Sequence, residues 1–220
     1  MALSLSAFVA TLQQMLDFLK QLTDPESIIS YGGLALLLFV VFAETGLLIG
    51  FFLPGDSLIF ISGMICRTKP ELLGVNITVL LILLIVAAVI GNMAGYWFGH
   101  KVGPALFNRK DSWLFKKRYL ETTRTFYDKN GGKTLILGRF LPIIRTFAPI
   151  LAGIIKIPFG RFMLFNIAGA VAWIVSLGLC GYFLGQIKWV QENIGYIVIF
   201  LIVITLIPVA TTWIRSKRKS

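Results

Sequence analysis

Two apolar segments of this chain each contain charged residues and a proline, and each is followed by a long uncharged stretch. The residues concerned are Glu44, Pro54, Gly55 and Asp56 in the first segment and Gly138, Arg139, Pro142 and Arg145 in the second. Charges are costly inside apolar sequence of membrane length, so the pattern favours a transport or ion-handling site. One segment holds only acids and the other only bases. This complementarity suggests a carrier whose site lies between two repeats.

The composition is typical of an integral membrane protein. Of the 220 residues, 57% are hydrophobic and 14% are charged, and the mean hydropathy is +0.83. These values lie outside the range of ordinary soluble domains. No low-complexity tract divides the sequence, so we expect a single membrane domain over residues 1–220. The net charge of +11 does not indicate nucleic-acid binding, because the basic residues cluster as on the cytoplasmic face of a membrane protein.

Three stretches are long and uncharged enough to cross a bilayer. They are residues 77–99, 162–187 and 194–214. An α-helix needs about 20 residues to span roughly 30 Å of hydrocarbon. We therefore expect three transmembrane helices, the last of them near the C-terminus within residues 188–220, which end in a basic tail.

The two charged segments are predicted to be broken rather than straight. Residues 31–65 are apolar but are interrupted by Glu44, Asp56 and the Pro54-Gly55 pair, so we expect two half-helices around a turn. Residues 135–158 repeat the theme. The three basic residues of this second segment lie among apolar residues, and its three prolines are predicted to break regular helix. They are Arg139, Arg145 and Lys156, and Pro142, Pro149 and Pro158. Broken backbone at membrane depth needs protein or water as a hydrogen-bond partner, so two re-entrant hairpins should face each other, with Pro54, Gly55, Gly138 and Pro142 at their turns.

A weak internal repeat relates the two halves. Residues 95–99 read Gly-Tyr-Trp-Phe-Gly, and residues 181–185 read Gly-Tyr-Phe-Leu-Gly, an offset of 86 residues. The same offset moves Pro54 to position 140, two residues from Pro142. Hairpin and helix therefore recur together, which favours duplication.

The basic residues predict the orientation. Between His100 and Thr134 lie nine Lys and Arg residues, and the tail after Ile214 has four more, together 13 of the 21. The positive-inside rule makes the central loop and the C-terminus cytoplasmic. The two hairpins must then enter from opposite faces. The predicted fold is an all-α integral membrane protein with an inverted repeat of two opposed re-entrant hairpins, each followed by a transmembrane helix, plus the C-terminal helix and an N-terminal amphipathic helix.

The charged residues suggest two different roles. Arg139 and Arg145 lie six residues apart across Pro142, and two guanidinium groups at one turn suit bidentate capture of a phosphate. Glu44 and Asp56 would compete for the arginines, so their protonation could free a guanidinium group for substrate. The alternative is that the four residues form only a structural ion-pair cluster.

These residues carry a family resemblance. The Glu44…Pro54-Gly55-Asp56 segment, the Gly138-Arg139-Phe140-x-Pro142-x-x-Arg145 segment and the Gly/aromatic helices resemble the DedA family, whose shared core is the VTT (SNARE-associated) domain, over residues 30–187. The resemblance implies a bacterial inner-membrane protein that moves undecaprenyl phosphate or phospholipids between leaflets, driven by the proton-motive force. It also implies functional importance for Glu44, Asp56, Arg139 and Arg145.

Other functions and partners remain open at this stage. A proton- or sodium-coupled antiporter for small ions is the second reading, in which the acids bind the cation. A membrane enzyme is disfavoured because His100 is the single histidine and the cysteines, Cys66 and Cys180, show no metal or redox spacing. We expect no cofactor and no metal. Expected partners are a lipid phosphate, protons or sodium, and the membrane, with a homo-oligomer as a further option.

Residues 3–22 are expected to form an amphipathic helix on the membrane surface, with a further span as the alternative.

Overall fold

The computed structural model describes residues 25–47, 55–108, 139, 142–193 and 195–197. Every regular element in these ranges is helical. In chain order they are α2 (Pro25–Gly46), α3 (Gly55–Thr68), the short 3₁₀ helix η2 (Pro70–Leu72), α4 (Ile77–Asn108), α7 (Pro142–Ile154), α8 (Phe159–Leu184) and α9 (Lys188–Glu192). The predicted all-α class is therefore confirmed over this part of the chain.

Two helices are long and apolar enough to cross a membrane, α4 over Ile77–Gly103 and α8 over Phe159–Leu184. Both correspond to predicted spans. Helix α4 runs on past the predicted end at Gly99 to Asn108, because the polar pair His100-Lys101 does not interrupt the helical hydrogen bonds. The predicted C-terminal span (194–214) and N-terminal amphipathic helix (3–22) lie almost wholly outside the described residues.

Helices α2 and α3 lie on either side of residues 48–54. Glu44 is in the last turn of α2 and Asp56 is in the first turn of α3. Gly33 kinks α2 with a φ of 53° and a ψ of −147°, a backbone conformation that glycine adopts without steric cost. Pro54 and the turn itself fall outside the described residues, whereas Gly55 is the first residue of α3.

Two prolines of the second segment lie at helix starts, and the third lies inside a helix. Pro142 begins α7 and Pro158 is the N-cap of α8, positions where a missing backbone N–H leaves no helical hydrogen bond unmade. Pro149 lies inside α7 without ending it, so the expectation that it breaks the helix is wrong. The chain reverses between α7 and α8 at Lys156, which has a φ of 56°. Gly138 lies outside the described residues.

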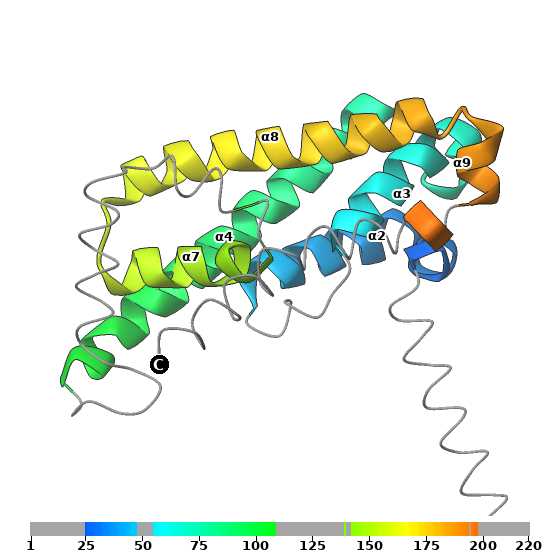
Figure 1. Ribbon diagram of the computed structural model, residues 1–220. Coiled ribbons are helices and arrows are strands. Elements are labelled where there is room, and N and C mark those ends of the chain that lie inside the picture. The colour runs from blue at the N-terminus through cyan, green and yellow to red at the C-terminus, as the bar shows by residue number, and fades with distance from the viewer. Residues whose placement is uncertain (1–24, 48–54, 109–138, 140–141, 194, 198–220) are drawn as a thin grey trace, which may run out of the picture.

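Helix α4 packs against α2, α7 and α8, while α3 packs mainly along α8 (Figure 1). The largest core cluster joins α2, α3, α4 and α8. Its fully buried members include Leu37, Val41, Leu58, Ile59, Leu80, Leu84, Trp173 and Ile174.

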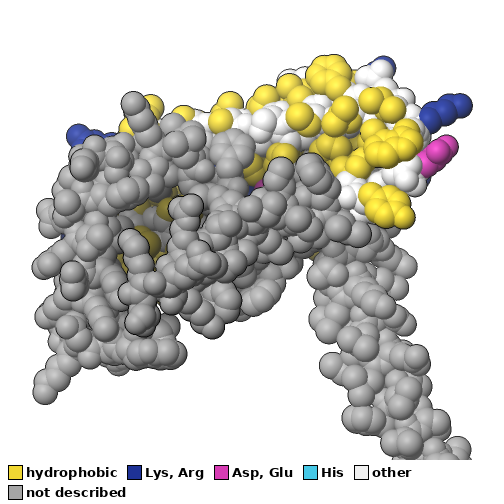
Figure 2. Space-filling view, viewed as in Figure 1, with side chains coloured by type: hydrophobic (Ala, Val, Ile, Leu, Met, Phe, Trp, Pro, Cys, Tyr) yellow, Lys and Arg dark blue, Asp and Glu magenta, His cyan; other side chains and the backbone are white. Residues whose placement is uncertain are grey.

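The outward faces of the helices are also apolar. Figure 2 shows hydrophobic side chains over the visible face of the described region, with charged side chains at its ends. Exposed hydrophobic residues of the described region include Phe183 and Trp189. An apolar exterior suits contact with lipid.

The offset of 86 residues recurs in the helix packing. Gly99 of α4 lies against Ile150 of α7, and Gly185, at the C-cap of α8, lies against Met64 of α3. The two pairs are equivalent, because Gly185 follows Gly99 by 86 residues and Ile150 follows Met64 by 86 residues. Each half-helix therefore packs on the long helix that follows the other segment, at equivalent positions.

Glycines allow this close approach. A Cβ atom on Gly153 would overlap the carbonyl oxygen of Tyr96, and one on Gly181 would overlap that of Phe60. Small residues at helix contacts matter in a membrane because lipid supplies little hydrophobic drive for association.

We expect Gly153→Ala and Gly181→Ala each to lower the free energy of unfolding by about 1–3 kcal/mol, because the added methyl group meets rigid backbone. The matched control is Gly160→Ala in the first turn of α8, where a Cβ atom meets nothing within 4 Å. Thermal or denaturant unfolding of the purified protein in detergent measures all three. Equal stability of Gly181→Ala and Gly160→Ala would contradict the packing described here.

Candidate functional site

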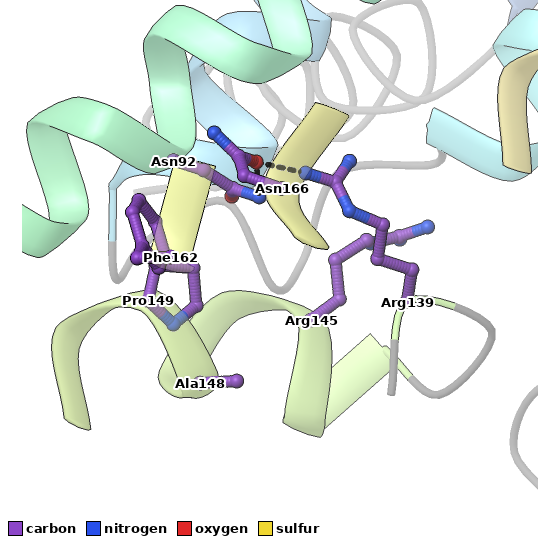
Figure 3. A pocket seen from close by; sticks show the side chains of 7 residues that line it. All are labelled: Asn92, Arg139, Arg145, Ala148, Pro149, Phe162 and Asn166. Atoms are coloured by element: carbon purple, nitrogen blue, oxygen red, sulfur yellow. Dashed lines mark hydrogen bonds between the residues drawn. The ribbon is translucent and has the colours of Figure 1, made fainter. Parts of the chain in front are cut away.

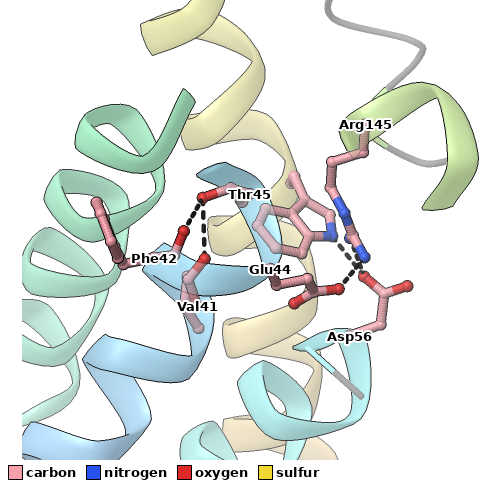
Figure 4. A network of polar contacts seen from close by, with 7 residues as sticks. Val41, Phe42, Glu44, Thr45, Asp56 and Arg145 are labelled. Atoms are coloured by element: carbon pink, nitrogen blue, oxygen red, sulfur yellow. Dashed lines mark hydrogen bonds and ion pairs between the residues drawn. The ribbon is translucent and has the colours of Figure 1, made fainter. Parts of the chain in front are cut away.

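Arg145 is the centre of a buried ion-pair cluster. It lies in the first turn of α7, and its Nη2 atom donates to Oε1 of Glu44 while its Nη1 atom donates to Oδ1 of Asp56 at 2.6 Å. Figure 4 shows the two carboxylates approaching the guanidinium from α2 and α3. One side chain therefore joins the ends of three helices. Because Glu44 is only 1% exposed and Arg145 4% exposed, water does not screen their attraction.

Local sequence explains why the acids lie here. Asp56 is in the first turn of α3, where the positive end of the helix dipole favours a carboxylate. Gly55 makes room for the second acid, since a Cβ atom at this position would overlap the carboxylate of Glu44. Gly55 and Asp56 therefore allow both acids to lie beside the start of α3.

Trp173 of α8 completes this cluster. Its indole N–H donates to Oδ1 of Asp56 at 2.8 Å, and the guanidinium carbon of Arg145 lies 4.4 Å from the ring centroid. The ring thus binds the cation through its face and the anion through its edge. Sequence reasoning missed this residue. The available signal was a tryptophan near the middle of an apolar span, away from the interfacial positions that tryptophan prefers.

Arg139 has neutral partners instead of carboxylates. Its Nη2 atom donates to Oδ1 of Asn166 on α8. The amide of Asn92 on α4 can point in two directions, and one of them matches its hydrogen-bonding neighbours. In that orientation its oxygen also accepts from Nη2 of Arg139, and its nitrogen donates to the carbonyl oxygen of Thr45 at 2.9 Å. Asn92 and Asn166 were also missed by sequence reasoning, because an uncharged amide does not interrupt a hydropathy pattern.

A narrow pocket lies between the two arginines and helices α4, α7 and α8. Its lining residues are Asn92, Arg139, Arg145, Ala148, Pro149, Phe162 and Asn166 (Figure 3). The space inside is close to that of one water molecule. Three buried polar atoms around the cluster have no hydrogen-bond partner among the described residues, namely Oε2 of Glu44, Nη1 of Arg139 and Nε of Arg145. Such atoms are uncommon in folded proteins and indicate capacity for a further ligand.

The structure thus divides the two arginines, which the sequence analysis treated alike. Glu44, Asp56 and Arg145 form one cluster, and Arg139 lies beside it without a carboxylate partner among the described residues. With both acids ionised, the formal charges of the two acids and two arginines sum to zero. Both carboxylates contact Arg145, however, and neither forms an ion pair with Arg139. The roles that we predicted for these residues, phosphate binding and proton coupling, stay predictions.

The fold and the site define a multi-helix membrane protein with a buried charge cluster between its helices. Comparison with known proteins agrees, because the VTT domain family matches residues 53–183. The chain is 39% identical over 184 residues to Protein DedA of Escherichia coli K12, which covers 84% of this chain and 83% of that protein. We conclude that the chain belongs to the DedA family.

Further relatives are also named as membrane proteins. The membrane protein Rv0364 of Mycobacterium tuberculosis H37Rv is 39% identical over 83% of this chain and 79% of its own length. The inner membrane protein YghB of Escherichia coli K12 is 32% identical over 76% of this chain and 77% of its own length. No solved structure matches the chain. The names of these relatives and the apolar helices together make this a membrane protein.

We expect Arg145→Gln to lower the free energy of unfolding by about 3–5 kcal/mol, because it leaves two carboxylates close together without their cation. Adding Glu44→Gln and Asp56→Asn to this variant should recover most of the loss. Arg67→Gln is the matched control, since Arg67 is an exposed arginine whose side chain contacts Tyr182 and lies away from the cluster. Unfolding in detergent measures each variant, and a single Arg145→Gln variant as stable as Arg67→Gln would contradict the pairing.

Proposed function

We propose that this protein moves a lipid phosphate, most simply undecaprenyl phosphate or a phospholipid, between the leaflets of the bacterial inner membrane, driven by the proton-motive force. The observation that carries the proposal is the pocket between Arg139 and Arg145, in which one buried guanidinium has no carboxylate partner among the described residues. An uncompensated buried cation is unfavourable, and an anionic ligand would compensate it.

The chemistry of the arginines suits a phosphate headgroup. A lipid phosphate must lose its hydration to cross the membrane, and each guanidinium can replace that hydration with paired, charge-assisted hydrogen bonds. The isoprenoid or acyl tail would stay in the bilayer, beside the apolar exterior of α4 and α8. The pocket has room for about one water molecule, so the headgroup can enter only if the pocket widens.

Proton binding to the acids supplies a way to widen it. Arg145 forms part of the pocket wall and is held there by Glu44 and Asp56. Protonation of a carboxylate removes its charge and weakens this hold, so Arg145 can turn toward a phosphate. Proton entry and lipid binding would then be coupled through one side chain.

The proposed architecture is a single membrane domain, residues 1–220, with two re-entrant hairpins that enter from opposite faces as an inverted repeat. The equivalent contacts of α4 with α7 and of α8 with α3, 86 residues apart, support this architecture. The charges that meet at the ends of α2 and α3 also support it. The concentration of Lys and Arg supports a cytoplasmic central loop and C-terminus. In this proposal the protein is a carrier without catalytic chemistry, and a homo-oligomer is compatible with it.

The alternative, a proton- or sodium-coupled antiporter for small ions, needs acids that are available to a cation. Glu44 and Asp56 both engage Arg145, so a small cation would have to compete with this guanidinium for the two carboxylates. Ion-flux measurements on the purified protein in liposomes separate the two functions.

We expect Arg139→Lys and Arg145→Lys each to slow lipid transport by about tenfold or more, because lysine keeps the charge but loses the planar fork and at least one charge-assisted hydrogen bond of about 1.5–3 kcal/mol. A leaflet-resolved assay in liposomes with several lipid phosphates measures the rate. Arg67→Lys, on the exposed end of α3, is the control and should transport normally. Full transport by both site variants would refute the phosphate clamp.

A second expectation concerns pH. Wild-type binding of lipid phosphate should strengthen as the pH falls, because protonation of Glu44 or Asp56 releases Arg145 from its anionic partners. Glu44→Gln and Asp56→Asn imitate the protonated acids, so each should bind well at high pH and lose this dependence. They should also fail to couple lipid movement to a proton gradient.

Affinity measured against pH in wild type and both variants decides the point. Titration of the phosphate itself is common to all three proteins and cancels when the variants are compared with wild type. A pH profile that stays unchanged in both variants would remove the carboxylates from the mechanism.

A further inference from the structure

The contacts of Arg139 differ in kind from those of Arg145. Arg139 is 2% exposed. Among the described residues, the partners of its Nη2 atom are the amide oxygen of Asn166 and, in the orientation of Asn92 given above, that of Asn92. Its Nη1 atom has no partner among the described residues, although the side chain lines the pocket (Figure 3). An amide oxygen can accept a hydrogen bond and orient a guanidinium, but it does not cancel its charge.

The two amides are themselves fixed by the helices that carry them. The Nδ2 atom of Asn166 donates to the carbonyl oxygen of Val89 at 3.2 Å. The Nδ2 atom of Asn92 donates to the carbonyl oxygen of Thr45 at 2.9 Å when its oxygen faces Arg139. Because each nitrogen is held by a backbone acceptor, each oxygen is directed at Arg139. The same contacts tie α4 to α8 and α4 to the end of α2.

We propose that Asn92 and Asn166 are positioning residues that hold Arg139 oriented but uncompensated, so that Arg139 is the primary phosphate-binding group of the pocket. Arg145 then joins the ligand only after release from Glu44 and Asp56. This inference rests on the proposed binding of a phosphate. It assigns functions to two neutral residues inside the spans, and it explains why no carboxylate among the described residues pairs with Arg139.

The decisive variant is Asn166→Asp. It keeps the size of the side chain and an oxygen acceptor for Arg139, but it adds the negative charge that the wild-type site lacks. An aspartate at position 166 would pair with Arg139 and compete with a phosphate. The change also removes the amide N–H that donates to the carbonyl oxygen of Val89. If Asn166 had only a structural role, the variant would therefore lower the thermal midpoint, and the folded protein would keep its phosphate affinity. Asn92→Asp applies the same test from α4.

The matched control is Asn76→Asp. Asn76 lies just before α4, where its side chain accepts a hydrogen bond from the backbone N–H of Val79. Asparagine and aspartate serve about equally well at such a helix start. This variant makes the same change of amide to carboxylate away from the pocket, so it should leave affinity and stability as in wild type.

The experiment titrates wild type, Asn166→Asp, Asn92→Asp and Asn76→Asp in lipid nanodiscs with farnesyl monophosphate and, separately, with inorganic phosphate. We expect both pocket variants to bind about tenfold or more weakly, with a thermal midpoint in the absence of ligand that equals or exceeds that of wild type. Much tighter binding of farnesyl monophosphate than of inorganic phosphate assigns the site to a lipid headgroup, and equal binding assigns it to free phosphate.

Three results would overturn the inference. They are wild-type affinity in both pocket variants, an equal loss in Asn76→Asp, and a wild type that binds neither probe. A transport assay distinguishes a failure of this inference from a failure of the proposed function. A wild type that binds phosphate through Arg139 but moves no lipid refutes the transport proposal and supports the positioning role, whereas transport that is insensitive to Asn166→Asp refutes the positioning role alone.

Discussion

The pairing of one guanidinium with two carboxylates at the ends of α2 and α3 is the interaction on which the rest of the site depends. Arg145, Glu44 and Asp56 come from three different helices, and all are largely removed from water. A buried charge without its partner is strongly destabilising, so the helix ends must meet for the chain to fold. Trp173 adds a fourth helix to the same point through its contacts with both signs of charge.

Close helix packing then determines where the second arginine lies. Glycines on α4 and α8 allow α7 and α3 to approach backbone to backbone, at positions related by a constant offset of 86 residues. This packing brings Asn92 of α4 and Asn166 of α8 together beside Arg139. The result is a site with two unlike cations, one neutralised by acids and the other surrounded by amides, which is an arrangement suited to binding and release of an anion in sequence.

Much of the site and part of the fold could be predicted from residue patterns. Charged residues inside apolar segments identify Glu44, Asp56, Arg139 and Arg145 because each is costly there and needs a partner. Uncharged length identifies α4 and α8. The prolines misled the prediction at Pro149, since a proline within a helix costs a hydrogen bond that surrounding packing can offset. Trp173, Asn92 and Asn166 escaped notice because a neutral side chain looks the same in a sequence whether it faces lipid or a buried cation.

Hydropathy and the cost of burying charge depend only on residue type and local length. The residue pattern is therefore enough to establish that this chain is a helical membrane protein and which four charges it must accommodate. How those charges pair depends on the packing of the helices. Arg139 and Arg145 are equivalent in type and lie six residues apart, so no local pattern separates them. The acids that engage Arg145 are 101 and 89 residues away along the chain, and the choice rests on distances and burial that arise only when α2, α3, α7 and α8 are packed together.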